Sequence, residues 1–329
     1  MKHIGKSYDK VDAKGILSGK PSYTGDFVPK DALIIKVLRS PHAQAKIKSI
    51  DTSKAKLIPG VEAIFTYEDV PNTRFTLAGQ TYPEPSAYDA LILDPVVRYV
   101  GDEVALVVAK DEATALKAMP LIKVEYEVQK PVLDLRTAMD HETVIHPEDD
   151  ILNHIPVGQD YKRNICVSYH KRVGDIEGEL AKCDYVVEGT YFDQATRQSA
   201  MEPFQSFGYI DHLGRIVIVS STQIVFHVRR HIARALGIPA SKIRVIKPRI
   251  GGGFGSKQTA CTELMTAFVT WKLQKPCYLL YDRTEAQTCS TTRHAREWYI
   301  RVGATKDGII QVIDMDSITD AGAHATHCF

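Results

Sequence analysis

The chain has 329 residues, of which 44% are hydrophobic and 25% charged, a composition typical of globular proteins with room for two domains. Its formal net charge of +1 gives no electrostatic reason to expect nucleic-acid binding. No apolar run approaches the roughly 20 residues that a membrane span needs, and the start lacks the apolar segment of a secretory signal. We therefore expect a cytoplasmic protein that binds neither nucleic acid nor membrane.

The cysteines are scattered along the chain, and no C-x-x-C pair occurs among them. This spacing argues against zinc ribbons, iron–sulfur clusters and redox pairs, and it fits isolated thiols in a reducing compartment. The six residues are Cys166, Cys183, Cys261, Cys277, Cys289 and Cys328.

The first part of the chain alternates short strands and helices. Residues 32–40 and 61–71 have strand patterns, and residues 97–128 predict a strand, a helix over 111–118 and a second strand. Val104 to Val108 is continuously apolar, as expected of a strand covered on both faces. We assign residues 1–135 to one α/β domain.

Residues 136–165 are polar and contain proline, which indicates a linker or wrapping segment. Residues 166–329 form the second predicted domain, again with mixed elements. Its predicted elements are a strand over 185–194, a hairpin over 205–222 that turns at His212–Gly214, an amphipathic helix with Ile224, Val228, Ile232, Ala235 and Leu236 on one face, a strand over 242–247, a helix with Leu264, Met265 and Phe268, and a hairpin around Asp307-Gly308.

A glycine-rich loop, PRIGGGFGSKQ at residues 248–258, lies between the predicted strand 242–247 and the following helix. Bare backbone in such a loop can present N–H groups to an anion. The P-loop pattern fails because Ser256 replaces its second glycine and Gln258 its hydroxyl residue. A dinucleotide loop starting at Gly251 is a near miss, because Ser256 stands where its third glycine belongs and the candidate acidic ribose ligands, Asp282 and Glu285, lie somewhat too far along the chain.

Ser221-Thr222-Gln223, an arginine-bearing helix and Gly251-Gly252-Gly253-Phe254-Gly255-x-Lys257 together resemble the molybdenum-binding large subunit of the xanthine dehydrogenase/aldehyde oxidase family. The resemblance runs along essentially the whole chain and is nearest to the bacterial xanthine dehydrogenase type. Further stretches support it: SYTGDF (22–27), RSPHAQAKI (39–47), GDEVALVVA (101–109), MEPF (201–204) and DAGAHAT (320–326).

This resemblance implies an α+β protein, in which an amino-terminal α/β hammerhead domain precedes the first, incomplete part of a molybdopterin-binding domain. It implies a molybdenum–molybdopterin cofactor and hydroxylation of an aromatic heterocycle, such as a purine, or of an aldehyde, with oxygen from water. Electrons would leave through iron–sulfur and FAD groups on partner subunits, because this chain has no cysteine pattern for such clusters.

The resemblance also implies roles for individual residues. Gln223 matches a glutamine whose amide hydrogen-bonds an oxygen ligand of molybdenum, and Phe254 belongs to the loop whose backbone reaches the metal's ligands. Gln258 stands where the eukaryotic xanthine enzymes carry a substrate-binding glutamate, so it is the candidate substrate residue. Glu202 is expected to be a structural acid. The full set of expected cofactor-binding residues is Gln223, Gly252, Gly253, Phe254 and Gly255.

No catalytic residue is expected in this chain. In the family, a second molybdopterin-binding half supplies the substrate arginine and the glutamate base, and we expect that half to be a partner of this chain. His294, His324 and His327 are more simply explained as core or surface histidines. Two alternatives remain open: a non-catalytic docking or cofactor-scaffold fragment, and a dinucleotide-dependent dehydrogenase that uses Gly251 and Gly253.

Overall fold

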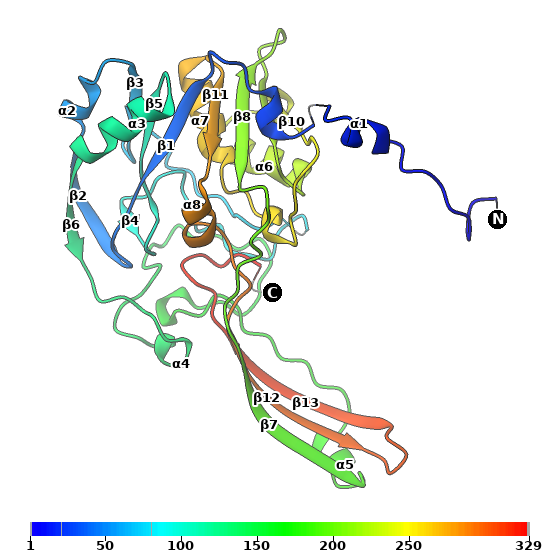
Figure 1. The fold of residues 1–329 in the computed structure, drawn as a ribbon. Helices are drawn as coiled ribbons and strands as arrows, with labels where there is room; N and C mark the ends of the chain where they lie inside the picture. The colour runs from blue at the N-terminus through cyan, green and yellow to red at the C-terminus, as the bar shows by residue number, and fades with distance from the viewer. Residues whose placement is uncertain (1, 21, 80, 328–329) are drawn as a thin grey trace.

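The computed structural model describes residues 2–20, 22–79 and 81–327. A seven-stranded mixed sheet, in the order β10-β9-β8-β11-β1-β5-β3, forms the body of the molecule (Figure 1). Its strands are β1 (Leu33–Arg39), β3 (Val61–Phe65), β5 (Glu103–Ala109), β8 (Gln205–Ile210), β9 (Ile216–Ser220), β10 (Ile243–Ile246) and β11 (Cys277–Leu280).

The central sheet joins strands from both ends of the chain. β1 pairs antiparallel with β5 and parallel with β11, with Leu33 opposite Cys277. β5 lies between β1 and β3, and its residues 104–109 are buried, as the continuous apolar run predicted. The predicted hairpin over 205–222 is confirmed as β8 and β9, which pair antiparallel. The strand β11, which makes the junction, is not among the predicted strands.

Two helices pack against the central sheet. The amphipathic helix is confirmed as α6 (Val225–Leu236), whose predicted apolar stripe contributes Val228 and Ile232 to the core, and which ends at Gly237 with φ +65°. The helix α7 (Glu263–Leu273) is buried along its first eight residues, because it packs between α6 and the strands β8, β9 and β11.

A second, three-stranded sheet in the order β4-β2-β6 completes the first part of the chain. It consists of β4 (Val96–Val97), β2 (Ala45–Asp51) and β6 (Lys123–Val128). The predicted helix over 111–118 is confirmed as α3 (Glu112–Ala118); Asp111 is its N-cap, and its side chain accepts the Thr114 N–H at 2.8 Å. The short helices elsewhere are α1 (Ala13–Leu17), α2 (Ser53–Lys56), α4 (Leu135–Ala138) and α8 (Arg283–Thr288), with 3₁₀ turns at η1 (Thr24–Phe27), η2 (Met119–Leu121), η3 (Tyr161–Arg163) and η4 (Ala240–Lys242).

A third sheet projects from the body as an arm, with β12 between β13 and β7 (Figure 1). Its strands are β7 (Tyr185–Asp193), β12 (Arg296–Ala304) and β13 (Ile310–Thr319), and the helix α5 (Ile176–Leu180) packs against it. The hairpin predicted around Asp307-Gly308 is confirmed, and Gly308 turns the chain with φ +80°.

Residues 136–165 are largely irregular and are held to the body by the buried side chain of Arg98. Its guanidinium donates to Asp94 Oδ2 at 2.8 Å, to Glu148 Oε1 at 2.5 Å and to the carbonyl of Ile145 at 3.0 Å. The division into domains at residues 135 and 166 stays a prediction. Within the described residues, none of the helices has the length and apolar character required to traverse a bilayer.

Replacing Arg98 with Met should destabilise the fold by about 3–5 kcal/mol, because Asp94 and Glu148 would lose a buried partner. Chemical denaturation followed by fluorescence measures this change. The control Arg163→Met removes the exposed pair with Asp140, and it should cost less than about 1 kcal/mol. Equal losses in the two variants would contradict the assignment of Arg98 as the anchor of this segment.

Candidate functional site

The glycine-rich loop follows β10 and adopts a backbone that few residues other than glycine tolerate. Gly252 and Gly255 have φ +99° and +90°, and Phe254 itself has φ +50°. The loop enters the 3₁₀ turn η5 (Ser256–Gln258), and α7 starts only at Glu263. The left-handed residues cannot continue into a right-handed helix, so the loop does not form a helix N-terminus.

Gln223 and the glycine loop, separate in sequence, meet in the structure. The Gln223 N–H donates to the carbonyl of Lys257 at 2.8 Å. A Cβ atom added to Gly253 would lie 2.5 Å from Gln223 Oε1, so the amide side chain lies directly across the bare backbone. The contact explains why a glycine is needed at this point, and it brings together two of the residues that the sequence marks as cofactor-binding.

The carboxylate of Glu202 holds the loop from behind. It accepts the Gly251 N–H at 2.6 Å, the Lys257 ammonium at 2.9 Å and the Gln205 amide at 2.7 Å. Lys257 is only 1% exposed, so this ion pair is shielded from water. All of these contacts serve the loop's conformation, which agrees with the structural role expected of Glu202.

The front of the loop offers hydrogen-bond donors that no other group uses. Among the described residues, none accepts a hydrogen bond from the backbone N–H groups of residues 252–255, and none bonds the side-chain amide of Gln223. Neutral donors held in place suit a cofactor that presents oxygen atoms, because they stabilise negative charge without adding a counter-charge. The residues present therefore fit the cofactor that the resemblance implies.

A cavity of about 870 Å³ opens beside the loop, a volume within the range of small-molecule sites. Phe254, Gly255 and Gln258 line it, whereas Gln223, Gly252 and Gly253 are not among its lining residues. The ring of Phe254 is 71% exposed. The candidate substrate residue and the loop's aromatic side chain thus share one space, and Gln223 contacts the same loop at Gly253.

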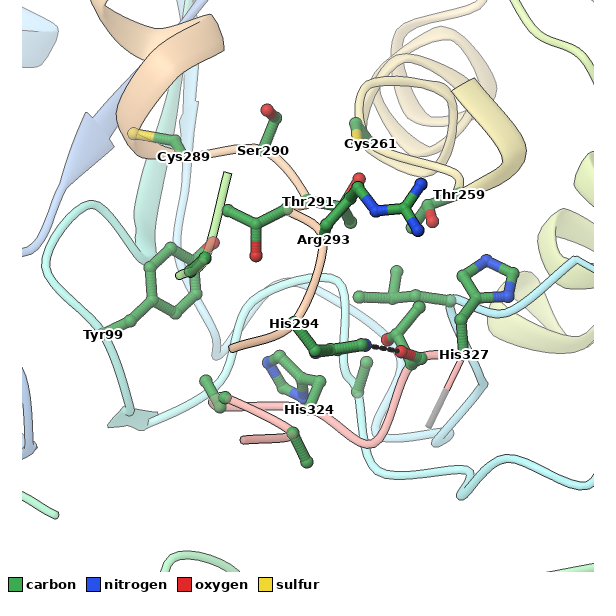
Figure 2. Close-up of a pocket in the computed structure, with 18 of the residues that line it drawn as sticks. Tyr99, Thr259, Cys261, Cys289, Ser290, Thr291, Arg293, His294, His324 and His327 are labelled. Atoms are coloured by element: carbon green, nitrogen blue, oxygen red, sulfur yellow. Dashed lines mark hydrogen bonds between the residues drawn. The ribbon is translucent and has the colours of Figure 1, made fainter. Parts of the chain in front are cut away.

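Three histidines that we expected to be core or surface residues also line this cavity, together with Arg293 (Figure 2). His294 Nε2 bonds the carbonyl of Thr326 at 2.8 Å, and His327 Nε2 bonds the carbonyl of Gln258 at 3.2 Å. The third histidine is His324. These side chains lie just before β12 or after β13, and only the return of the arm to the body brings them to the loop, so sequence spacing could not reveal them.

Burial sets the protonation of several groups in the cavity. It raises the pKa of Asp102 to about 7, with repulsion from Glu103 adding to the effect. Burial lowers the pKa of His324, but the facing carboxylate of Asp89 more than offsets this, so the pKa lies above its usual value. Burial also raises the pKa of the Cys261 thiol and of the Tyr99 hydroxyl, which keeps both neutral.

Two side-chain groups have the composition of metal sites: Glu84 with His227 and His231, and Asp89 with His146 and His324. In the first, an Arg230 guanidinium nitrogen lies 3.0 Å from Glu84 Oε1 and 2.7 Å from His227 Nδ1, where it already supplies positive charge. In the second, Asp89 accepts the Ala325 N–H at 2.8 Å and faces His324 Nδ1 at 3.3 Å. Both groups contain their own counter-charges, and neither includes the glycine loop.

Replacing Lys257 with Met should cost about 3–5 kcal/mol of folding free energy, because Glu202 would be left buried without its cation. The control Lys275→Met breaks a more exposed pair with Glu62 and should cost less than about 1 kcal/mol. Adding Glu202→Gln to the Lys257 variant should recover part of the loss, as measured by urea denaturation. No recovery in the double variant would contradict the proposed coupling.

The raised pKa of Asp102 makes stability depend on pH. Between about pH 4 and pH 7 the folded chain retains a proton that the unfolded chain has released, so this group lowers the free energy of unfolding as pH rises. In Asp102→Asn, the unfolding free energy should fall less over this range than in the wild type, apart from a constant offset. Parallel curves for the two proteins, measured by urea denaturation at pH 4, 5, 6 and 7, would contradict the assignment.

Comparison with known proteins gives a consistent answer over both parts of the chain. Residues 18–130 match the family model described as "Aldehyde oxidase and xanthine dehydrogenase, a/b hammerhead domain", and residues 157–328 match "Molybdopterin cofactor-binding domain". The probable hypoxanthine oxidase XdhD of Escherichia coli K12 is 38% identical over 98% of this chain and 36% of its own length. The nicotinate dehydrogenase large molybdopterin subunit of Eubacterium barkeri is 31% identical over 98% of this chain and 72% of its own.

Solved structures agree. CO dehydrogenase from Oligotropha carboxidovorans superposes with a TM-score of 0.77 at 29% identity, over 95% of this chain and 39% of that one. Aldehyde oxidoreductase from Desulfovibrio gigas shares the fold with a TM-score of 0.79 at 24% identity, over 96% of this chain and 34% of that one. The chain thus spans less than half the length of the Escherichia coli relative and of these structures. It belongs to the xanthine dehydrogenase/aldehyde oxidase family of molybdopterin-dependent oxidoreductases.

Proposed function

We propose that this chain is the first part of the large subunit of a molybdenum hydroxylase. The enzyme hydroxylates an N-heterocycle such as a purine, or an aldehyde, with oxygen from water, and it passes electrons to iron–sulfur and FAD partner subunits in the cytoplasm. The observation that carries the proposal is the amide of Gln223 lying across Gly253, beside backbone N–H groups that have no partner within the described part of the chain. The chain alone is not expected to perform the reaction.

The cofactor, when bound, supplies the oxidation–reduction chemistry, and the residues of this chain hold and orient it. The side-chain amide of Gln223 and the N–H groups of residues 252–255 donate hydrogen bonds toward the cofactor without adding charge. Phe254, which lines the cavity, would form an apolar wall next to the bound cofactor. Gln258 faces the cavity as a neutral amide, so it can donate to and accept from a heterocycle but cannot act as a base.

Two relatives favour a heterocyclic substrate over an aldehyde, because their names specify hypoxanthine and nicotinate. The nicotinate dehydrogenase subunit also supports the expectation of a second molybdopterin-binding half as partner. This chain covers 72% of that subunit but only 36% of the Escherichia coli hypoxanthine oxidase, so the family includes molybdopterin subunits of very different length. A non-catalytic scaffold is the alternative function, and turnover of a substrate by the assembled complex would exclude it.

Gln223→Ala and Gly253→Ala should each lower kcat about 100-fold in the assembled, molybdenum-containing complex. The first variant removes the amide, and the second forces it aside, because the new methyl group would meet Gln223 Oε1. Turnover of hypoxanthine and of nicotinate with an artificial electron acceptor measures the effect, alongside metal analysis.

The matched controls are Gln129→Ala, an exposed amide that does not line the cavity, and Gly15→Ala, whose added methyl group would lie 3.9 Å from Lys20 Cδ, an ordinary van der Waals contact. Both should retain full activity. A wild-type complex without molybdenum, or full activity in both loop variants, would refute the proposed function.

A further inference from the structure

The projecting arm has two faces, and its strand register assigns each residue to one of them. Side chains alternate along a strand, and residues directly opposite on neighbouring strands share a face. Val302 of β12 pairs with Val187 of β7 and Ile313 of β13, so these three lie together. The next row along the strands, Val186 with Gly303 and Val312, lies on the opposite side.

One face of the arm is apolar over almost its whole length. We call this the apolar face of the arm; it consists of Tyr185, Val187, Gly189 and Tyr191 of β7, Trp298, Ile300, Val302 and Ala304 of β12, and Ile313, Met315 and Ser317 of β13. No charged side chain lies among them. Val187 is 64% exposed and Met315 56%, so the described residues leave this face uncovered. Exposed apolar surface of this extent typically marks an interaction site.

The opposite face is partly covered within the chain, around Gly303 and Val312. A Cβ atom on Gly303 would meet Cys183 Sγ at 2.6 Å and Leu180 Cδ2 at 3.2 Å, because α5 and the turn after it pack there. The guanidinium of Arg301 bonds Glu177 and Asp314 on this side, both at 2.6 Å. The arm thus has a second layer over part of one face and none, among the described residues, over the apolar face.

The apolar face leads directly to the cavity. At its inner end Trp298 Nε1 donates to Asp193 Oδ2 at 2.7 Å, and Trp298, Asp193 and Arg296 all line the cavity together with Phe254 and Gln258. A protein layer that covers the apolar face therefore reaches the mouth of the cavity, where it can contribute side chains to the site.

We propose that the apolar face of the arm is the docking surface for the second molybdopterin-binding half, the polypeptide that corresponds to the remaining length of the relatives' subunits. The inference rests on the proposed function and specifies where its partner binds. An uncharged face suits a permanent partner rather than a transient one. The Escherichia coli relative is more than twice as long as the region it shares with this chain, so it carries the polypeptide needed to cover such a face.

The test compares charges placed on the two faces of the same strands. Val187→Lys with Met315→Lys alters the apolar face, and Val186→Lys with Ile318→Lys is the matched control on the opposite face, where the exposed fractions are 48% and 44%. Each tagged protein is purified from its source cell, and the recovered polypeptides are identified by mass spectrometry. Recovery of the second-half polypeptide should fall at least tenfold with the apolar-face variant and stay unchanged with the control.

Thermal unfolding of the purified chains checks that both double variants fold, since all four positions are exposed. Undiminished recovery with the apolar-face variant overturns the proposal, as does a wild-type chain that uses this face to bind a second copy of itself, detected by analytical ultracentrifugation. Metal analysis separates this proposal from the proposed function: molybdenum in a complex that tolerates the apolar-face charges refutes only the docking surface, and a face-dependent complex without molybdenum refutes only the function.

Discussion

The parallel pairing of β11 with β1 is the contact on which the architecture depends. It covers only three residue pairs, from Leu33 with Cys277 to Ile35 with Leu279, but it joins the strands of the amino-terminal part to those of the later part in one sheet. Ile35, Cys277 and Leu279 are fully buried there. β11 also pairs with β8, which follows Glu202 in the sequence, and it contacts α7, which follows the glycine loop. The segments on both sides of the site are therefore fixed to the central sheet.

The two sides of the glycine loop differ in their hydrogen bonding. Behind the loop, the Glu202 carboxylate accepts hydrogen bonds from Lys257 and Gln205 in a region closed to water. In front, the amide of Gln223 and the loop's N–H groups point to no partner in the described chain. A loop that is held rigidly on one side and presents unused N–H donors on the other is preorganised for binding, because little must move when a ligand arrives.

The sequence predicted those features that local chemistry determines. Apolar patterns located β1, β5, β8 and β9, the clustered glycines marked one segment of the site, and the family resemblance marked Gln223, which contacts that segment. It missed β11, because the five apolar and aromatic residues between Pro276 and Asp282 form too short a run to show a periodicity. The cavity histidines and the apolar face of the arm depend on how distant segments fold back together. Both features depend on the register in which distant strands pair, and no single stretch of the sequence determines that register.

Phe254 has a consequence for the order of events in this molecule. A phenylalanine with φ +50° carries backbone strain of about 1–3 kcal/mol, and its ring gains little from burial while it stands in the open. The folded chain therefore holds this ring in a conformation from which it does not yet benefit. In the proposed complex, a molecule that fills the adjoining space would bury the ring and supply the compensation, so completion of the site would be an assembly step that follows folding and is energetically distinct from it.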